Sequence, residues 1–424
     1  MLKGAEEAEL RSAWDWTPGK RHVADLRQRA GDFEWREEHQ VSPDGENIAA
    51  VVKLGETSTV CVSGDFWYLE FEKIWNVRYS PDGRLTALVM TEDEWTVAVD
   101  ERLWPEAYAY LWDTRFSADG RVIAVAVQQD MRYGMIQDGT IWNHLFDNAT
   151  GFAMSRDGSA TAAVVQTVPF GQADIFTYQK GCYTVAVNSV AWDQNFVNAW
   201  SPVFSPDGNR VAAQVRTSLF DYTIAVDGTL WPRIFTNVWE PCFDPEGSTV
   251  IAPVRTKSGW GLARDGELFW KPRFHQLWGQ QCHGSSIYAI VAPRFGHWAV
   301  AKDGVPWKDH RAEALSDLRV SPDGSRAAVR AKVKNQWTLC IDGTFWDETA
   351  DMIWQPVFSP DGSQVATKVE KGGRYTVALD QRHYREEFDN LWEPVFSPEG
   401  DRILIRGVKD ENYYRIVAPV DDFI

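Results

Sequence analysis

Residues 200–235, WSPVFSPDGNRVAAQVRTSLFDYTIAVDGTLWPRIF, determine the fold of this chain. The segment has two apolar runs, at 211–215 and 222–226, and two tight-turn signals, Ser-Pro-Asp-Gly at 205–208 and Asp-Gly at 227–228. Proline and Asp-Gly favour the backbone angles of hairpin turns, and β-branched residues flank them. The resulting order of strand, turn, strand, loop, strand, turn and strand is typical of one β-propeller blade.

The Ser-Pro-Asp-Gly turn, with variants, recurs about every 38 residues along the chain. Its ten glycines are Gly45, Gly83, Gly120, Gly158, Gly208, Gly247, Gly284, Gly324, Gly362 and Gly400. No segment inside the repeat keeps a 3.6-residue apolar period, which excludes stacked helices. The sequence therefore predicts an all-β fold, a β-propeller of about ten four-stranded blades. We favour one ring over the alternative, two five-bladed rings, because no linker separates the repeats.

The ends of the chain predict how the ring closes. The repeats occupy residues 35–424, and the last repeat stops at Phe423 and Ile424, where its fourth strand is due to begin. Because an unpaired strand edge invites aggregation, residues within 14–40 are expected to complete or cap the final blade. Residues 1–34 are thus predicted to form an N-terminal arm that closes or caps the ring. The run KGAEEAEL near its start favours a short helix.

Most of the 22 tryptophans recur in phase with the repeat. They form three columns, in the fourth strand (such as Trp231), before the Ser-Pro-Asp-Gly turn (such as Trp200), and at the start of the third strand (such as Trp260). A residue present once per blade is expected to be a wedge between blades, because an indole buries a large area. The tryptophans outside these columns precede the first full repeat and are predicted to contact a partner: Trp14, Trp16 and Trp35.

An insertion of about a dozen residues interrupts the fourth repeat, between its second and third strands. It covers residues 167–181 and carries Phe170, Phe176 and Tyr178. Loops that interrupt a regular array often carry function, so these three aromatic residues are further candidates for partner binding. An insertion without function is the alternative.

The sequence contains no GxSxG elbow, HExxH, P-loop or GxGxxG motif after a strand. The turn acids recur in equivalent positions, which indicates turn chemistry rather than paired catalytic carboxylates. We therefore expect no enzymatic activity and no cofactor. The candidate metal ligands are His275, Cys282, His283 and His297 of the seventh repeat, but their spacing matches no known zinc motif. Surface histidines in a degenerate blade are the alternative.

Charge and cysteine content limit the environment and the partners. The net charge is −17, which repels nucleic-acid phosphates and anionic lipid headgroups. The five cysteines are scattered without a CxxC pair, which argues against a disulfide framework and fits a reducing compartment. The first residues lack a secretory signal, and no stretch has the ~18–20 apolar residues of a membrane helix. These features predict a cytoplasmic protein without direct membrane insertion.

The repeated Ser-Pro-Asp-Gly hairpin resembles the WD40-like repeat of TolB-type propellers from about residue 38 onward. Such propellers serve as scaffolds, peptide binders and enzyme lids. The tryptophan content, size and predicted cytoplasmic character together resemble the tryptophan-rich subunits of Tmc transmembrane redox complexes of sulfate-reducing bacteria. That resemblance implies an accessory subunit without its own cofactor, associated with the membrane through redox-complex partners.

We therefore expect a non-enzymatic scaffold that binds protein partners, such as an accessory cytoplasmic subunit of a membrane-bound electron-transfer complex. Two alternatives stay open. One is a ligand-binding or hydrolytic propeller with a site in its central channel. The other is metal binding through the histidines of the seventh repeat.

Overall fold

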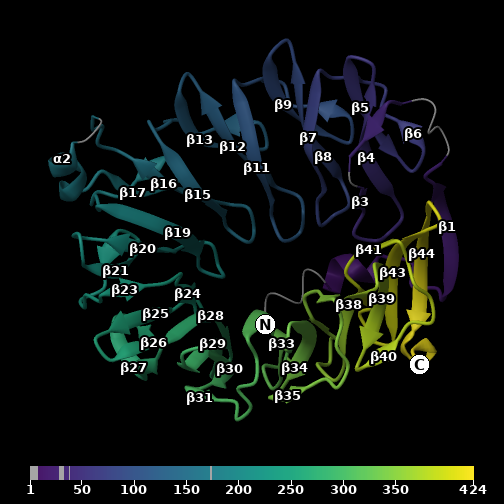
Figure 1. Cartoon of the computed structure of the whole chain (residues 1–424). Coiled ribbons are helices and arrows are strands. Elements are labelled where there is room, and N and C mark those ends of the chain that lie inside the picture. The colour runs from purple at the N-terminus through teal and green to yellow at the C-terminus, as the bar shows by residue number, and fades with distance from the viewer. Residues whose placement is uncertain (1–7, 28–32, 38, 172–173) are drawn as a thin grey trace.

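A computed structural model describes residues 8–27, 33–37, 39–171 and 174–424. Ten antiparallel sheets stand around a single ring, and the first strand of each sheet lies nearest the ring axis (Figure 1). This confirms the predicted all-β propeller of ten four-stranded blades and excludes the two-ring alternative. We number the blades 1–10 in chain order, so that blade 10 is the sheet containing β43 and β44.

The first strands are continuous in six blades: β7 (Lys73–Tyr79), β11 (Tyr110–Phe116), β15 (Ala149–Met154), β19 (Asn198–Phe204), β28 (Gln276–His283) and β32 (Ala314–Val320). In the other four blades the first strand is split in two: β2 (Trp35–Arg36) and β3 (Gln40–Val41), β23 (Asn237–Val238) and β24 (Cys242–Phe243), β36 (Met352–Ile353) and β37 (Val357–Phe358), β41 (Asn390–Leu391) and β42 (Val395–Phe396). The second strands are β4 (Ile48–Leu54), β8 (Leu85–Thr91), β12 (Ile123–Gln129), β16 (Thr161–Gln166), β20 (Val211–Arg216), β25 (Val250–Thr256), β29 (Ser286–Arg294), β33 (Ala327–Val333), β38 (Val365–Lys371) and β43 (Arg402–Lys409).

The third strands are β5 (Thr57–Val62), β9 (Glu94–Val99), β13 (Arg132–Gln137), β17 (Tyr183–Val187), β21 (Tyr222–Val226), β26 (Gly259–Arg264), β30 (His297–Lys302), β34 (Gln336–Ile341), β39 (Arg374–Leu379) and β44 (Asn412–Pro419). The outer strands are β6 (Asp65–Phe66), β10 (Arg102–Leu103), β14 (Thr140–Ile141), β18 (Val190–Ala191), β22 (Thr229–Leu230), β27 (Glu267–Phe274), β31 (Val305–Pro306), β35 (Thr344–Phe345), β40 (Arg382–His383) and, in blade 10, β1 (Gly19–Asp25). The helices are α2 (Ile175–Lys180), a 3₁₀ turn η1 (Val420–Asp422) and a helical turn at residues 8–12. The earlier part of the predicted N-terminal helix, residues 3–7, lies outside the described residues.

The core consists of ten apolar clusters, each lying between two neighbouring blades. Between blades 5 and 6, for example, Trp231 and Phe235 pack against Phe243 of the next blade. Trp192 lies against Gly228, where an added Cβ would stand 3.3 Å from the indole, so this turn fits closely against its neighbour. The fourth-strand column of tryptophans therefore has the wedge role predicted from the repeat.

The joint that closes the ring, between blades 10 and 1, is more polar than the other nine. Its apolar cluster contains only Ala24, Ile48, Val408 and Tyr413 as buried members. At its centre the buried guanidinium of Arg406 donates to carbonyl oxygens of the first Ser-Pro-Asp-Gly turn, including that of Ser42 at 3.1 Å. Two further hydrogen bonds end on the same turn: Arg415 Nε donates to the carbonyl oxygen of Asp44, and the Tyr413 hydroxyl donates to that of Gly45. A third joins the arm, since Arg415 Nη2 donates to the carbonyl oxygen of Asp15.

The N-terminal arm supplies the outer strand of the last blade. Strand β1 pairs antiparallel with β44, with Gly19 opposite Val417 and Asp25 opposite Asn412. In Figure 1 the first and last strands accordingly lie side by side. Phe423 does not begin a fourth strand of blade 10, because it bridges to Tyr384 in blade 9 instead.

Candidate interaction surface

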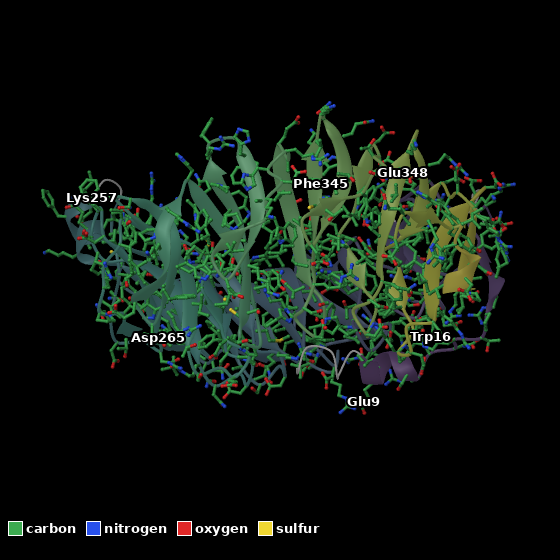
Figure 2. The ribbon with its side chains drawn as sticks, turned by 90° about the horizontal axis from the view of Figure 1, so that it is seen from below. Glu9, Trp16, Lys257, Asp265, Phe345 and Glu348 are labelled. Atoms are coloured by element: carbon green, nitrogen blue, oxygen red, sulfur yellow. The ribbon has the colours of Figure 1, made fainter. Side chains whose placement is uncertain are left out.

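Each blade sends its turns to two opposite faces of the ring. We call lower the face that carries the turns between first and second strands and between third and fourth strands. The upper face carries the hairpins between second and third strands and the connections to the next blade. Figure 2 shows Lys257 and Glu348 at the upper face and Asp265, Glu9 and Trp16 at the lower face.

The Ser-Pro-Asp-Gly turns build the lower face with one repeated hydrogen-bond pattern. In blade 5 the buried hydroxyl of Ser205 donates to Asp207 at 2.5 Å and accepts from the backbone N–H of Arg210 at 3.0 Å. The hydroxyl of Ser205 and the side chain of Asn209 lower the pKa of Asp207 to about 2. The serine-to-aspartate bond recurs at Ser42, Ser80, Ser117, Ser155, Ser321 and Ser359.

The second hairpin of each of blades 1–9 has its own clamp on the lower face. Asp342 has φ of 50°, and its carboxylate accepts from the backbone N–H of Ala327, the first residue of β33, at 2.8 Å. The same arrangement recurs at Asp100, Asp138, Asp227, Asp265, Asp303 and Asp380. Asn188 replaces the aspartate in blade 4 and Ser63 does so in blade 1, with the same kind of bond. These acids are engaged in turn structure.

The start of the arm also lies on the lower face. Trp14 and Trp16 stack with ring centroids 6.0 Å apart, and both side chains are half-buried. The guanidinium of Arg402, which follows the last Ser-Pro-Glu-Gly turn, donates to the backbone carbonyl of Trp16 at 2.7 Å. The structure therefore ties these two candidate residues to blade 10.

The upper face exposes large apolar side chains at the tips of several hairpins. Met131 in blade 3, Phe176 in blade 4, Phe220 in blade 5 and Phe295 in blade 7 are between 75% and 90% exposed. Equivalent tips in other blades carry polar residues or glycine, such as 334–335 (Lys-Asn). Large apolar side chains that stand in solvent can mark a site of protein binding. We call these four residues the upper row.

The three aromatic residues of the blade 4 insertion, all predicted to bind a partner, differ in their exposure to solvent. Phe170 and Tyr178 are half-buried and contact each other with ring centroids 5.9 Å apart. Helix α2 begins after Asp174, whose carboxylate accepts from the backbone N–H of Thr177 at 3.0 Å. Phe176, on this helix, is 80% exposed. Phe170 and Tyr178 thus support the loop, and Phe176 faces solvent.

The tryptophan column before the Ser-Pro-Asp-Gly turns lies on the first strands, close to the ring axis. Trp75, Tyr110 and Trp112 form a run of ring contacts across blades 2 and 3, with centroids 5.7 Å and 5.8 Å apart. Trp200 and Trp239 are 37% and 42% exposed. For these two residues the wedge interpretation is incomplete, because a large part of each indole reaches solvent.

The first strands are also where the backbone departs from regular pairing. Trp35, the third candidate from the arm, begins β2 and is 52% exposed. In blades 2 and 5 the register shifts directly after the column tryptophan, and Asn76 and Ser201 there have φ of 53° and 47°. Such β-bulges bend the strand and redirect side chains. The β-bulges of blades 2 and 5 lie at equivalent positions of their first strands, near the ring axis.

Sequence reasoning missed Met131, Phe220 and Phe295. Their signal was available: an apolar residue stands at a hairpin tip that most repeats fill with glycine or a polar residue. Residues that recur once per blade could not reveal these three, because each differs from the residue at the equivalent tip of other blades. The structure does not bring Trp14 and Trp16 together with Phe176, because they lie on opposite faces.

The four candidate metal ligands of the seventh repeat do not form one cluster. His275 precedes β28 and His283 ends it, so they lie at opposite ends of an eight-residue strand. His297 pairs with Arg294 at the upper hairpin, while Cys282 pairs with Ile287 near the lower turn. Among the residues that the structure describes, no three or more His, Cys, Asp or Glu side chains are grouped to hold a metal ion.

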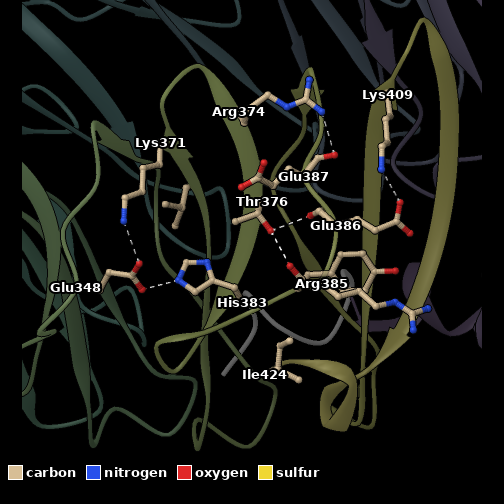
Figure 3. A pocket seen from close by; sticks show the side chains of 12 residues that line it. Glu348, Lys371, Arg374, Thr376, His383, Arg385, Glu386, Glu387, Lys409 and Ile424 are labelled. Carbon is tan, nitrogen blue, oxygen red and sulfur yellow. Dashed lines mark hydrogen bonds and ion pairs between the residues drawn. The ribbon is translucent and has the colours of Figure 1, made fainter.

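A cleft of about 570 Å³ lies at the rim between blades 9 and 10 (Figure 3). Several of its charged groups pair with one another. Glu348 contacts the imidazole of His383 at 2.5 Å and Lys371 at 3.7 Å, and Glu386 contacts Lys409 at 3.2 Å. Lys20 of β1 also contacts Glu386, and these cations lower its carboxyl pKa. Ion pairs therefore join the arm and blades 8–10 in this cleft.

No helix among the described residues combines the length and the apolar character needed to cross a bilayer. No protein-family model matches the chain, and neither does any curated protein. Similar solved structures include hydrazine synthase of Kuenenia stuttgartiensis, which is 11% identical over 92% of this chain and 96% of that chain, with a TM-score of 0.29. That likeness carries no functional argument. No family match supports the resemblance to TolB-type propellers or to Tmc subunits. What is shown is the fold, a ten-bladed β-propeller.

Proposed function

We propose that this propeller is a non-enzymatic scaffold that binds a protein partner through its upper face. The observation that carries the proposal is the upper row, four large apolar side chains that stand in solvent where a second strand connects to a third. Binding energy at protein interfaces is concentrated in a few large, mostly aromatic side chains that become buried. Three of the four residues in the row are phenylalanines, which have little conformational freedom to lose on binding.

The rigidity of the ring supports the same proposal. Ten apolar joints and the repeated lower-face turns hold the blades in fixed positions, so the hairpin tips keep their spacing. A surface that is already ordered loses less entropy on binding than a flexible one does. The net charge of −17 favours a partner whose docking face is basic around an apolar centre.

In its finer form the proposal makes the chain an accessory cytoplasmic subunit of a membrane-bound electron-transfer complex. The resemblance in tryptophan content and size to the tryptophan-rich Tmc subunits supports this form. The structure qualifies that support, because fourth-strand tryptophans such as Trp231 are explained by packing between blades. The partner in this form is another subunit, and the chain reaches the membrane through it.

The proposal is tested by capturing partners from detergent-solubilised membranes and from the cytosol of the source organism with the tagged full-length chain. We expect one stoichiometric protein that the Phe220→Ser variant loses and that the Thr229→Ser variant keeps. Phe220 and Thr229 are both exposed residues of blade 5, but they lie on the upper and the lower face. Equal capture by both variants would contradict an upper-face interface.

The finer form has its own outcome in the same experiment. Recovery of haem or iron–sulfur subunits with the wild-type chain would support it. Recovery of a partner without redox subunits would refute the finer form and leave the scaffold proposal standing.

A further inference from the structure

Cys242 and Cys282 meet in the joint between blades 6 and 7. Their Sγ atoms are 3.6 Å apart, although the residues are 40 positions apart in the sequence. Cys242 lies in β24, a first-strand segment of blade 6, and Cys282 lies in β28, the first strand of blade 7. Both contact the apolar cluster between these blades.

The repeat explains why these two side chains face each other. Cys242 is paired with Ile251 and Cys282 with Ile287, and both isoleucines belong to the same joint. Opposed residues of an antiparallel pair point to the same side of the sheet. Cys242 therefore points forward from blade 6, and Cys282 points back from blade 7.

Cys182 and Cys340 have different surroundings, because both are buried. Burial raises the pKa of the Cys340 thiol to about 12, and burial also raises the pKa of Cys182. The Cys282 thiol behaves oppositely, since its hydrogen bond with Cys242 lowers its pKa. Cys242 and Cys282 are only half-buried, so a small oxidant can reach them. Thiolate character and access together determine which cysteines react with oxidants.

We propose that Cys242 and Cys282 are a modification site, a thiol pair that a hydroperoxide oxidises to a reversible disulfide linking blade 6 to blade 7. A disulfide has an S–S distance of about 2.05 Å, so the two sulfur atoms must approach by roughly 1.5 Å. The inference concerns the axial side of the ring and does not rest on the proposed upper-face interface.

The reaction balances with the hydroperoxide as oxidant. The Cys282 thiolate attacks one peroxide oxygen, the O–O bond breaks, and the leaving oxygen takes a proton to give water or an alcohol. Cys282 then carries a sulfenic acid. The Cys242 sulfur attacks that sulfur, the S–S bond forms, and the S–O bond breaks. The departing hydroxide takes the Cys242 proton as water, so two thiols supply the two electrons that reduce the peroxide.

The link would join two blades that are otherwise held by non-covalent packing. Blades 6 and 7 are also the two whose lower turns lack the usual serine. The turn that ends at Gly247 begins with Asp244, and the turn that ends at Gly284 begins with Gln281. The thiol pair therefore lies beside the two turns that lack the serine-to-aspartate hydrogen bond of the other blades. A dithiol such as dithiothreitol would reverse the link.

The test treats the purified full-length chain with a slight molar excess of hydrogen peroxide, then alkylates it and digests it without reduction. We expect the fully reduced chain to carry five alkylated cysteines and the oxidised chain three, since two thiols are consumed. Mass spectrometry should identify a peptide pair linking residue 242 to residue 282, which dithiothreitol removes.

Variants locate the reaction. Cys242→Ser should leave a sulfenic acid at residue 282 that dimedone traps, because the resolving thiol is gone. The control Cys61→Ser should form the 242–282 link at the wild-type rate. Peroxide treatment of the wild-type chain that leaves five free thiols, or that links other cysteines, would overturn the proposal without reference to any variant.

Discussion

The lower and upper faces of the ring are built from different kinds of sequence. The lower face repeats two turns in nearly every blade, and its serine and aspartate side chains are used in backbone hydrogen bonds. The upper face has hairpin tips that vary from blade to blade, and four of them expose large apolar side chains. Repetition along this chain therefore marks what holds the ring together. Departure from the repeat marks the positions at which we propose that a partner binds.

Replacing two members of the upper row should weaken partner binding strongly. The double variant Phe176→Asp and Phe220→Asp places two charges where a partner would bury two rings. We expect affinity for the captured partner to fall about 100-fold or more, as for central residues of an interface. The measurement is titration of the purified partner by calorimetry.

The same double variant should fold as the wild-type chain does. Both side chains are about 80% exposed, so the free energy of unfolding should change by no more than about 0.5 kcal/mol. Strong destabilisation would show that the row is structural, and unchanged affinity would show that the partner binds elsewhere.

Replacing a clamp residue of the lower face should lower the free energy of unfolding. Asp342→Leu removes the clamp on Ala327 and forces a branched side chain into a left-handed backbone conformation. We expect the free energy of unfolding to fall by about 2 kcal/mol, with partner affinity unchanged. Chemical denaturation measures the loss.

Asp342→Asn is the matched control, because Asn188 fills this position naturally in blade 4 with φ of 46° and the same hydrogen bond. It should cost clearly less than the leucine variant. Equal loss in both variants would mean that the carboxylate charge matters more than turn geometry.

The turn aspartates should make the stability of the fold depend on pH. The pKa values of Asp207 and Asp323 are lowered to about 2 by serine hydroxyls and by neighbouring side chains and N–H groups. An aspartate whose pKa is lower in the folded state stabilises the fold above its unfolded pKa of 3.8. That stabilisation is lost as pH falls from about 4 towards 2. Unfolding measured over this range should show less pH dependence in the Ser205→Ala variant, and an unaltered profile would contradict the account.

The smallest effect is expected at Met131. Asp130 and Met131 both have positive φ, 51° and 60°, in a turn that favours asparagine or glycine. Met131→Asn should therefore raise the free energy of unfolding by about 0.5–1 kcal/mol and weaken partner binding. A variant that is stabilised but binds normally would remove Met131 from the upper row.

The turn period made the fold predictable, because Ser-Pro-Asp-Gly and Asp-Gly each specify local backbone geometry that does not depend on distant contacts. Gly208 and Asp227, for example, adopt the positive φ that the turn assignment requires. Blade number followed from counting turns. The single ring followed from the absence of a linker, and the structure agrees.

The rest depended on contacts between distant segments. The incomplete last repeat predicted that residues within 14–40 close the final blade. Nothing in the local sequence of Gly19–Asp25 singles it out as the strand that does so, since its partner β44 lies at the other end of the chain. The meeting of Cys242 and Cys282 required knowing which face of each sheet a residue occupies. The exposure of Phe220 could be inferred only by comparing its position with the tips of other blades.

Photo-crosslinking in living cells can show whether the partner binds the upper face. A photoreactive amino acid replaces Phe220 in one full-length chain and Thr229 in another, so that both probes lie on blade 5 but on opposite faces. The account predicts a covalent adduct with the same protein that capture identifies, formed from position 220 and not from position 229. An adduct formed from position 229 alone, or equally from both positions, would contradict it.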